Sequence, residues 1–460
     1  MKGADAARSI AIIGAGWAGL AAAVRATEAG WKVSLFDMAN QVGGRARSVE
    51  VDGLWLDNGQ HILIGAYVRT LALMHTVGAD VGGGLWRQPL EFRYPDGRGL
   101  KLPPGPAVLA FVRAVLACRG WRWRDRIALL AAAAGWAAAG FRCAPGLTVQ
   151  ALCHRLPAPV RQLLIDPLCV AALNTPASEA SAQVLLRVLC DALFSGRGGA
   201  DLLLPRHSLS RLLPQPAQGW LQVAGASIRL GRQVQRLAPE GRAWQVDGER
   251  FDAVVLACSA TEAARLAQGV APHWAERARA LRYEPIVTVY LQCEGARLPS
   301  AMTALLEGPQ APAQFAFDQG ALGATPGMFA FVVSGSRRWV DAGLPATGQA
   351  VLQQALQAFA PGTWPTPPRV LKVLAEKRAT FRCTPMLDRP PAAVAPGLWA
   401  AGDYVAGPYP ATLEGAVRSG EAAVAGLAGV AGLAGLAGVG GLAGVGGVWG
   451  EKAACFDRSD

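Results

Sequence analysis

Residues 9–37 read SIAIIGAGWAGLAAAVRATEAGWKVSLFD, and this stretch decides the fold. An apolar run predicts a buried strand, an alanine-rich segment predicts a helix, and a second apolar run ends at Asp37. The turn between the first strand and the helix carries the spacing GxGxxG in Gly14, Gly16 and Gly19. Such glycines permit a tight turn, a close approach of a pyrophosphate to the backbone and close packing of helix on strand. The stretch therefore predicts a βαβ unit that binds a dinucleotide, with Asp37 accepting hydrogen bonds from ribose hydroxyls.

The composition is typical of a large globular protein with an apolar interior. The chain has 460 residues, of which 52% are hydrophobic and 17% are charged, and its formal net charge is +11. This length predicts two packed domains of roughly 150 to 250 residues each, enough for a deep apolar cavity. The positive charge attracts the phosphate groups of nucleic acid or of anionic lipid, and charge alone does not distinguish the two.

The cysteines bear on the compartment and on metal binding. Nine cysteines are scattered singly between Cys118 and Cys455, and none forms a CxxC pair. The sequence therefore indicates neither a metal site nor a disulfide framework, and reduced thiols favour a cytoplasmic protein. The first residues pass directly into the dinucleotide fingerprint without the apolar core and cleavage site of a secretory signal, so we expect no export.

A second glycine-rich motif follows the second predicted strand. Residues 41–48 read QVGGRARS, in which Gly43 and Gly44 precede Arg45. The motif resembles the GGRxxS motif of the flavin amine oxidase and phytoene (carotenoid) desaturase superfamily. The resemblance implies that the paired glycines lie against the diphosphate of FAD and that Arg45 complements its negative charge.

The end of the chain carries a motif that belongs with the first two. Residues 397–427 read GLWAAGDYVAGPYPATLEGAVRSGEAAVAGL and resemble the closing motif of the same superfamily. This resemblance implies that Asp403, after Gly402, accepts hydrogen bonds from the ribityl chain of FAD. Thr412 and Leu413 would open the last helix, with backbone N–H groups toward the pyrimidine edge of the flavin. The expected cofactor is therefore FAD, bound by both ends of one chain.

Between these motifs the pattern predicts a discontinuous α/β architecture. A Rossmann-like FAD-binding domain is expected over residues 1–85, 205–270 and 390–425. An inserted substrate domain of mixed sheet and helices is expected over residues 86–204, which read as largely helical, and 271–389. Within the second insert we expect strands at 283–293 and 327–335 and a helix at 346–360. The resemblance to the superfamily implies that Val234, where the chain returns to the first sheet, is the neighbour of the adenine.

Residues 57–67 read DNGQHILIGAY and place Gly59, Gln60 and His61 inside an otherwise apolar run. The segment resembles the hydroxysqualene dehydroxylases, also known as squalene-associated FAD-dependent desaturases, and less closely the phytoene and zeta-carotene desaturases. The stretch RATFRCTP at residues 378–385 supports the same family, and the shared motifs extend from residue 9 to about residue 425. Asp37 stands where the superfamily more often has glutamate, but either carboxylate can reach a ribose.

The resemblance implies the reductive dehydroxylation of hydroxysqualene to squalene in bacterial hopanoid or related triterpene biosynthesis. A hydride from reduced flavin would reach an allylic, cation-like carbon whose hydroxyl has been protonated, in an apolar tunnel that excludes water. Gly59 would contact the cofactor, and Gln60 and His61 would lie beside the isoalloxazine. His61 would act as the general acid or orient the leaving hydroxyl. The alternative is a buried His61 that only bonds to flavin or backbone.

Other functions compete with this interpretation. A carotenoid desaturase shares the fold, the FAD and a long isoprenoid substrate, but moves hydride to the flavin instead of from it. A noncatalytic lipid-binding protein would keep FAD as a structural group, and an NAD-dependent dehydrogenase would need a nicotinamide site. No nucleic-acid recognition module accompanies the basic residues, so we expect no nucleic-acid partner. The physiological reductant stays unknown because no second dinucleotide fingerprint is present. Arg378 and Thr380 are candidates for the substrate cavity, with structural roles as the alternative.

Two segments raise the question of peripheral contact with the inner face of the cytoplasmic membrane. In residues 111–126, arginines surround Phe111, Trp121 and Trp123, which suits a lipid headgroup layer and equally a surface turn between two core helices. Residues 426–460 repeat Gly with Leu and Val and form a low-complexity tail. This tail is interpreted as a flexible or partly helical segment, a membrane-embedding segment or an oligomer contact.

Overall fold

The computed structural model describes residues 8–436 of the chain. Six strands within this range form a sheet in the order β10-β2-β1-β14-β21-β20. Their bounds are β1 Ser9–Ile13, β2 Lys32–Phe36, β10 Ser227–Arg229, β14 Ala253–Leu256, β20 Ala393–Ala395 and β21 Leu398–Ala400. The first five strands pair in parallel, and β20 runs antiparallel to β21 at the edge. The central strands are almost uniformly buried, as expected when helices cover both faces of a parallel sheet.

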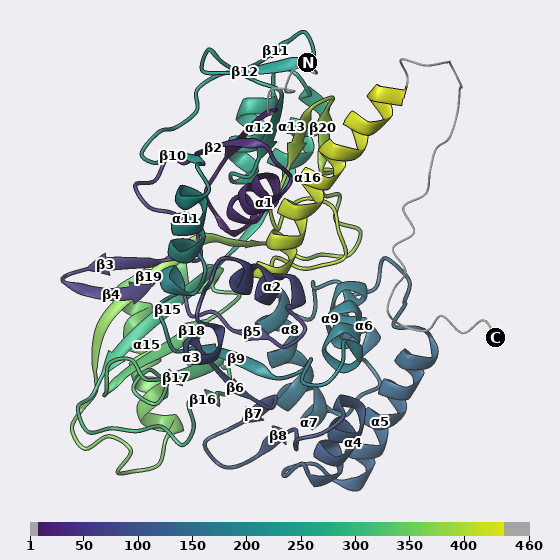
Figure 1. Cartoon of the computed structure of the whole chain (residues 1–460). Coiled ribbons are helices and arrows are strands. Elements are labelled where there is room, and N and C mark those ends of the chain that lie inside the picture. Colours follow the sequence, from purple (N-terminus) through teal and green to yellow (C-terminus); the bar gives the residue numbers. More distant parts are fainter. Residues whose placement is uncertain (1–7, 437–460) are drawn as a thin grey trace.

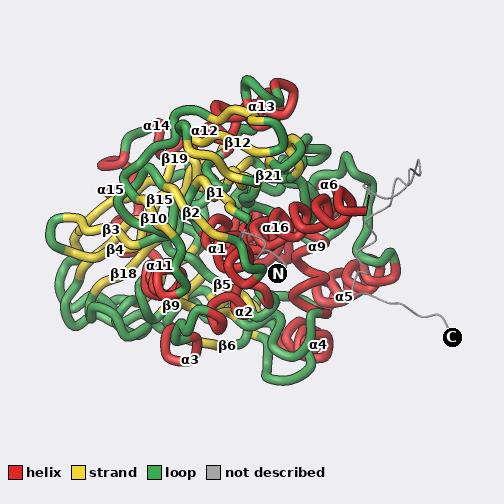
Figure 2. Tube along the Cα trace, turned by 45° about the horizontal axis from the view of Figure 1, so that its top comes forward, coloured by secondary structure: helices red, strands yellow, loops and turns green. Residues whose placement is uncertain are grey.

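Helices α1 (Trp17–Glu28) and α16 (Leu413–Leu436) lie side by side against this sheet (Figures 1 and 2). Small residues let α16 approach closely. A Cβ added to Gly420 would lie 2.1 Å from the carbonyl oxygen of Ala18, and one added to Gly426 would lie 2.1 Å from the Trp399 ring. Because nothing larger than glycine fits at either position, the glycines of this helix serve packing as well as flexibility. Helices α2 Val68–Thr76, α11 Pro214–Val223, α12 Ala260–Ala267 and α13 Pro272–Ala280 surround the same domain.

Five further strands of the described chain form an antiparallel sheet in the order β16-β17-β18-β15-β19. Their bounds are β15 Tyr283–Gln292, β16 Met302–Ala304, β17 Phe315–Asp318, β18 Met328–Val333 and β19 Arg369–Phe381. One face packs through Val287, Val289 and Leu291 in a core that includes helix α15 (Leu344–Ala358), with the short α14 (Arg337–Asp341) beside it. The expected strands and helix of this region are confirmed.

The region between residues 81 and 212 is helical, as expected, but it also holds short strands. Its helices are α3 Val81–Gly84, α4 Ala107–Ala117, α5 Trp123–Ala138, α6 Val149–Leu152, α7 Ala158–Val160, α8 Asp166–Leu173, α9 Ala182–Phe194 and α10 Leu209–Leu212, with a π-helical turn at Arg161–Ile165. Its strands are β6 Leu85–Gln88, β7 Glu91–Arg93, β8 Gly99–Lys101 and β9 Leu202–Pro205. The α4–α5 pair forms one end of the molecule, away from α1 and the first sheet (Figure 1).

The remaining strands form small antiparallel ladders. They are β3 Ser48–Val51 with β4 Leu54–Asp57, β5 Leu63–Ile64 on β9, and the meander β11 Leu237–Glu240, β12 Ala243–Val246 and β13 Glu249–Phe251. The strands of the first sheet come from all three segments that the sequence assigns to the FAD-binding domain, and the predicted α/β fold class is confirmed.

The segment expected as a low-complexity tail divides at residue 436. Its first part continues α16, and residues 437–460 lie outside the described residues. Within residues 8–436, no helix combines the length and the apolar character needed to cross a membrane.

Candidate active site

The turn after β1 holds its glycines in contact with other backbone. Gly14 has φ +114° and donates its N–H to the carbonyl oxygen of Phe36 at 2.7 Å. A Cβ on Gly14 would lie 2.5 Å from the carbonyl oxygen of Ala257, and a Cβ on Gly19 would lie 1.8 Å from that of Gly14. Both positions therefore accept only glycine, as the GxGxxG spacing predicts.

The N-terminus of α1 faces glycine backbone. Gly16 caps this 12-residue helix, and no side chain in the described part of the chain caps its first N–H groups. Gly16 forms a parallel bridge with Gly43, whose N–H donates to Ala15 O at 2.8 Å, and a Cβ on Gly16 would lie 3.8 Å from the Cα of Gly44. An uncapped helix N-terminus beside bare backbone supplies N–H donors and positive potential to a diphosphate. The arrangement fits FAD.

Asp37 follows β2 and has a structural role that the sequence did not reveal. One carboxylate oxygen accepts from the N–H of Ala15 at 2.6 Å, and the other accepts from the N–H of Ala39 at 2.8 Å. Its own backbone joins Arg229 and Arg232. The carboxylate expected to hold a ribose is therefore fixed to the glycine turn itself, and each oxygen keeps a second lone pair for a ligand.

Arg45 and Asp403 meet each other. A guanidinium nitrogen of Arg45 lies 2.6 Å from the carboxylate of Asp403, which is 7% exposed. The other nitrogen donates to the carbonyl oxygens of Arg378 at 3.2 Å and Ala379 at 2.6 Å. The resemblance assigned these two residues to different parts of FAD. In the structure they form an ion pair with each other, and Arg45 also contacts the backbone of β19.

Arg389 organises the loop of the closing motif, and no sequence motif had indicated it. Its guanidinium donates to the carbonyl oxygens of Asp403 at 2.6 Å, Gly407 at 2.9 Å and Tyr409 at 2.7 Å. Gly402, just before this loop, donates its N–H to the hydroxyl of Ser419 at 2.8 Å. The loop is thereby held to both β21 and α16.

The start of α16 is capped by Thr412, whose hydroxyl accepts from the N–H of Gly415 at 3.1 Å, and the next residue, Leu413, is partly buried. Glu414 is buried and joins this helix to α2. Its carboxylate accepts from the N–H groups of Arg69 at 3.1 Å and Thr70 at 2.9 Å. Glu414 therefore caps the N-terminus of a second helix.

Val234 lies in the loop between β10 and β11 and is 3% exposed. Its carbonyl oxygen accepts from the guanidinium of Arg265 on α12. This contact fixes the loop that follows β10, and the contact of Val234 with the adenine stays a prediction.

The segment between β4 and β5 holds Gly59, Gln60 and His61. The Nδ1 of His61 lies 2.8 Å from the carbonyl oxygen of Gly59, so Nδ1 carries the proton and Nε2 is free to accept in the neutral ring. Burial lowers the pKa of His61, as does the nearby charge of Arg45, although the bond to Gly59 opposes the change. Gln60 accepts from the side-chain amide of Gln319 at 2.8 Å, which ties the segment to the loop after β17.

Asp57, the last residue of β4, directly precedes this segment, and its carboxyl group has a raised pKa. Burial raises the pKa of Asp57 to about 6, although one carboxylate oxygen accepts from the Ser48 hydroxyl at 2.7 Å and from the N–H of Leu209 at 3.0 Å. Its carbonyl oxygen accepts from the hydroxyl of Tyr290 at 3.0 Å. Asp57 therefore connects the β3–β4 hairpin to α10 and to the second sheet.

Tyr290 and Thr288 occupy one face of β15, opposite to the face that packs on α15. Phe315, Phe317 and Val332 belong to the same apolar cluster as Tyr290. Thr288 is 1% exposed, and its hydroxyl has no partner among the described residues. The hydroxyl of Tyr404, beside Gly402, is also buried and finds no partner within residues 8–436. Buried hydroxyls without a partner indicate places where a bound group completes the site.

The two candidates from β19 have structural partners. The hydroxyl of Thr380 accepts from the side chain of Asn174 at 2.9 Å, and the guanidinium of Arg378 donates to the hydroxyl of Thr261 at 3.3 Å. Thr380 is therefore committed to Asn174, whereas Arg378 remains exposed.

The model of the family "Flavin containing amine oxidoreductase" matches residues 17–428. The chain belongs to this family. The predicted FAD cofactor and the predicted oxidoreductase class are thereby confirmed.

Curated relatives extend the comparison. A hydroxysqualene dehydroxylase of Rhodopseudomonas palustris is 29% identical over 444 residues, covering 90% of this chain and 97% of that protein. A probable zeta-carotene desaturase of Synechococcus elongatus is 36% identical over 110 residues, which cover 20% of this chain. The resemblance to hydroxysqualene dehydroxylases is confirmed along almost the whole chain.

A solved oxidoreductase from Methanosarcina mazei has the same fold as this flavin amine oxidoreductase. The two structures superpose with a TM-score of 0.69 at 17% identity, over 90% of this chain and 99% of the other. The two-sheet architecture is therefore shared by proteins whose sequences have diverged widely.

Proposed function

We propose that this flavin-dependent oxidoreductase reductively removes the hydroxyl group of hydroxysqualene to give squalene, in the biosynthesis of hopanoids or related triterpenes. The observation that carries the proposal is the length of the similarity. The hydroxysqualene dehydroxylase matches over 97% of its own length, including the substrate domain, whereas the probable zeta-carotene desaturase matches over only 22% of its own length. Similarity confined to a short stretch would indicate a shared cofactor domain, while similarity across both domains supports a shared substrate class.

The proposed reaction places three demands on the chain. The C–O bond of the substrate breaks, the hydroxyl leaves as water after it accepts a proton, and a C–H bond forms at the same carbon. Reduced FAD, when bound, supplies the hydride for that bond. The protein must bind an apolar chain, control one proton and exclude water.

His61 is the proposed proton-handling group, and Gln60 is proposed to position it. At neutral pH the ring is uncharged and Nε2 is an acceptor, so His61 orients the substrate hydroxyl. When the ring takes up a second proton it becomes a cation whose Nε2–H can donate to the leaving oxygen, and the lowered pKa of His61 moves this step to more acidic pH. The bond between Gln60 and Gln319 holds this segment against the second sheet.

Thr288 is proposed to bind the substrate oxygen. Its hydroxyl is buried on the apolar face of β15 and has no partner among the described residues, and a buried hydroxyl without a bond costs roughly 1 to 3 kcal/mol. A Thr288→Val variant keeps the shape and removes the donor, so KM for the hydroxylated substrate should rise while FAD content is unchanged. A Thr288→Ser variant should restore KM. An unchanged KM in Thr288→Val would remove Thr288 from the site.

The α4–α5 pair is proposed as a peripheral contact with the inner face of the cytoplasmic membrane. Apolar side chains are exposed along it, with Trp123 at 66% and Ile127 at 62%. The other exposed apolar residues are Val108, Leu109 and Leu116, and the exposed arginines are Arg113, Arg119, Arg122 and Arg124. Asp125, the acidic residue of α5, is buried at the helix cap. Apolar side chains among guanidinium groups are complementary to a bilayer with anionic headgroups.

The two tryptophans expected at this surface have different roles. Trp121 is 5% exposed and donates to the carbonyl oxygen of Pro159 at 3.3 Å, so it belongs to the core. Trp123 remains outside, with the guanidinium of Arg126 over its ring at 5.1 Å. The proposed contact therefore depends on Trp123 and Ile127.

The membrane contact is tested by cosedimentation with phosphatidylcholine vesicles that contain phosphatidylglycerol. A Trp123→Ser/Ile127→Ser variant should lose binding, whereas Val223→Ser, a change at a 92% exposed valine on α11, should not. A second comparison uses the chain truncated after Leu436, which leaves α16 intact. Loss of binding in the truncated chain alone would assign the anchor to the removed segment instead.

The function is tested by product analysis. The purified chain is offered hydroxysqualene with chemically reduced flavin, and in parallel phytoene with oxidised flavin. Squalene from the first mixture supports the proposal, and a desaturated product from the second mixture alone would replace it with the carotenoid desaturase function.

A further inference from the structure

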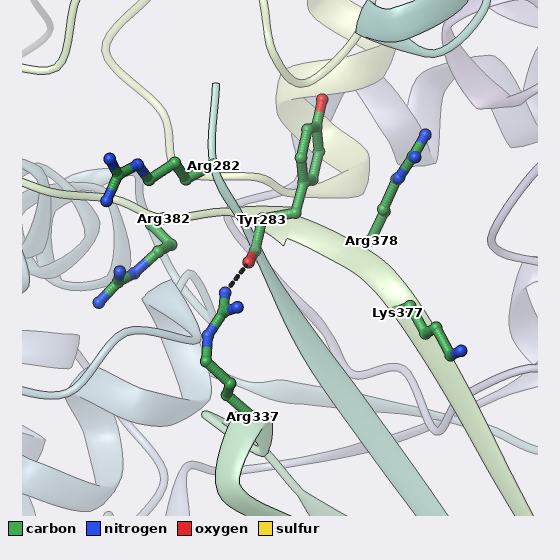
Figure 3. Close-up of a pocket in the computed structure, with 6 residues that line it drawn as sticks. All are labelled: Arg282, Tyr283, Arg337, Lys377, Arg378 and Arg382. Carbon is green, nitrogen blue, oxygen red and sulfur yellow. Dashed lines mark hydrogen bonds between the residues drawn. The ribbon is translucent and has the colours of Figure 1, made fainter. Parts of the chain in front are cut away.

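A basic cavity of about 620 Å³ lies beside the start of β15 and the end of β19, which pair with each other. It is lined by Arg282, Tyr283, Arg337, Lys377, Arg378 and Arg382. Five of these six residues are cations, and none is a carboxylate. Figure 3 shows Arg282, Arg337 and Arg382 on one side of Tyr283, and Lys377 and Arg378 on the other. A smaller cavity of about 170 Å³ adjoins it and shares Tyr283, Arg337 and Lys377.

Two of the five cations are neutralised by the fold. Arg337 lies 3.4 Å from the buried carboxylate of Glu284, and Arg382 lies 3.5 Å from the same group. Arg382 also pairs with Glu179, and Arg337 donates to the carbonyl oxygen of Tyr283 (Figure 3). These contacts anchor the cavity wall and fix the direction of both guanidinium groups.

The other three cations have no carboxylate partner among the described residues. Arg378 donates to the neutral hydroxyl of Thr261, and the side chains of Arg282 and Lys377 have no bond within residues 8–436. The nearby carboxylates do not line this cavity. Glu376 accepts from Asn58 and from the N–H of Arg378, and Asp341 lines only the smaller cavity. The cavity therefore keeps an excess of positive charge.

We infer that this cavity binds a phosphate-bearing ligand, with Arg282, Lys377 and Arg378 as its donors. Guanidinium and ammonium groups form strong charge-assisted hydrogen bonds with phosphate oxygens, and the Tyr283 ring adds an apolar wall. A volume of about 620 Å³ is within the range of small-molecule sites and exceeds what a single phosphate needs. The ligand therefore carries a larger group, either as a soluble phosphorylated compound or as a lipid headgroup.

This site is separate from the FAD cradle. The diphosphate of FAD belongs at the N-terminus of α1, among Gly16, Gly43 and Gly44, and none of these glycines lines the basic cavity. The two regions are nevertheless adjacent, because Arg45 donates to the carbonyl oxygens of Arg378 and Ala379. The inference stands independently of the proposed dehydroxylation.

The binding test uses the full chain loaded with FAD, so that the cofactor site is filled. Pyrophosphate is titrated in by calorimetry at low ionic strength. The Arg282→Gln/Lys377→Gln variant removes two donors that have no partner in the fold, and Arg242→Gln removes an exposed arginine of the β11–β12 turn as a matched control. Wild type and the control should bind alike, and the double variant should bind about tenfold more weakly or worse. Added salt should weaken wild-type binding.

A second arm distinguishes the two sources of phosphate. Phosphatidylcholine vesicles with and without phosphatidylglycerol are cosedimented with the same proteins, which must melt at the wild-type temperature. Loss of pyrophosphate affinity without loss of vesicle binding in the double variant assigns a soluble ligand. Loss of vesicle binding that depends on phosphatidylglycerol assigns a lipid headgroup. Equal binding of both probes by wild type and the double variant would overturn the inference.

Discussion

Arg45 and Asp403 lie 358 positions apart in the sequence, and their side chains form an ion pair of 2.6 Å. The pair joins the glycine-rich segment after β2 to the loop after β21, and Arg45 also reaches two carbonyl oxygens of β19. Both chain ends and the second sheet therefore meet at one guanidinium group. This contact positions the two motifs that are expected to enclose FAD.

Loss of this pair should weaken both stability and cofactor binding. An Asp403→Asn variant leaves Arg45 without its counter-charge in a partly buried place, so the free energy of unfolding should fall by about 1 to 3 kcal/mol. FAD content, measured by absorbance of the purified protein, should fall as well. Glu28→Gln, which breaks the exposed pair of Arg25 and Glu28, should change stability by less than about 0.5 kcal/mol. Full FAD content in Asp403→Asn would show that the pair does not organise the cofactor site.

The pH dependence of turnover tests His61. Because burial lowers the pKa of His61, its cationic form becomes populated only at a more acidic pH than that of an ordinary imidazole. If the ring donates the proton, the single-turnover rate of flavin reoxidation should rise as pH falls from 7.5 to 5.5. In His61→Gln this rise should disappear, and the rate at pH 6 should fall by about 100-fold or more. The same rising profile in His61→Gln, with FAD retained, would assign the proton to another group.

Asp57 should make the protein less stable as pH rises through the acid range. Its folded pKa of about 6 exceeds the ordinary value of 3.8, so the folded protein holds this proton longer than the unfolded chain. Stability therefore falls between about pH 4 and pH 6, by up to about 3 kcal/mol, and the loss persists above pH 6.

Urea unfolding from pH 4 to pH 8 measures this effect. The Asp57→Asn variant should lose that part of the pH dependence, whereas Asp52→Asn, a change at the exposed partner of Lys372, should keep it. Identical pH profiles for wild type and Asp57→Asn would contradict the raised pKa.

Glu414 should carry more stability than its neighbour Glu421, although both interact with the Arg69 residue of α2. Glu414 is 1% exposed and bonds to two backbone N–H groups, to the Thr70 hydroxyl and to Arg418. Glu414→Gln should therefore cost about 3 kcal/mol or more. Glu421→Gln removes only an exposed pair at 2.7 Å and should cost less than about 1 kcal/mol. Equal midpoints of thermal unfolding for the two variants would refute this difference.

The sequence predicted the parts of the fold that depend on local pattern. The strand–turn–helix of residues 9–28 and the long strands β15 and β18 follow from glycine spacing and apolar alternation, which are properties of neighbouring residues. The pairing of Arg45 with Asp403, the loop held by Arg389 and the capping of α2 by Glu414 depend on contacts between distant segments. No local pattern encodes such contacts, so they appear only when the chain is folded.

The same distinction applies to the basic-aromatic stretch and to the segment DNGQHILIGAY. Trp121 and Trp123 are two positions apart, but only the fold decides that the first is buried and the second exposed. Likewise the sequence located His61, whereas the bond from Nδ1 to Gly59 and the burial that lowers its pKa come from the folded segment. The basic cavity was not predicted, because its cations come from α14, from β19 and from the residues just before β15 and just after β19.

The most direct test of the proposed function is an anaerobic single turnover. The flavin of the purified protein is reduced chemically, hydroxysqualene is added, and flavin reoxidation is followed by absorbance while squalene is quantified by mass spectrometry. The proposed function predicts one squalene formed for each flavin reoxidised. A flavin that stays reduced, at full FAD occupancy and with hydroxysqualene in excess, would contradict it.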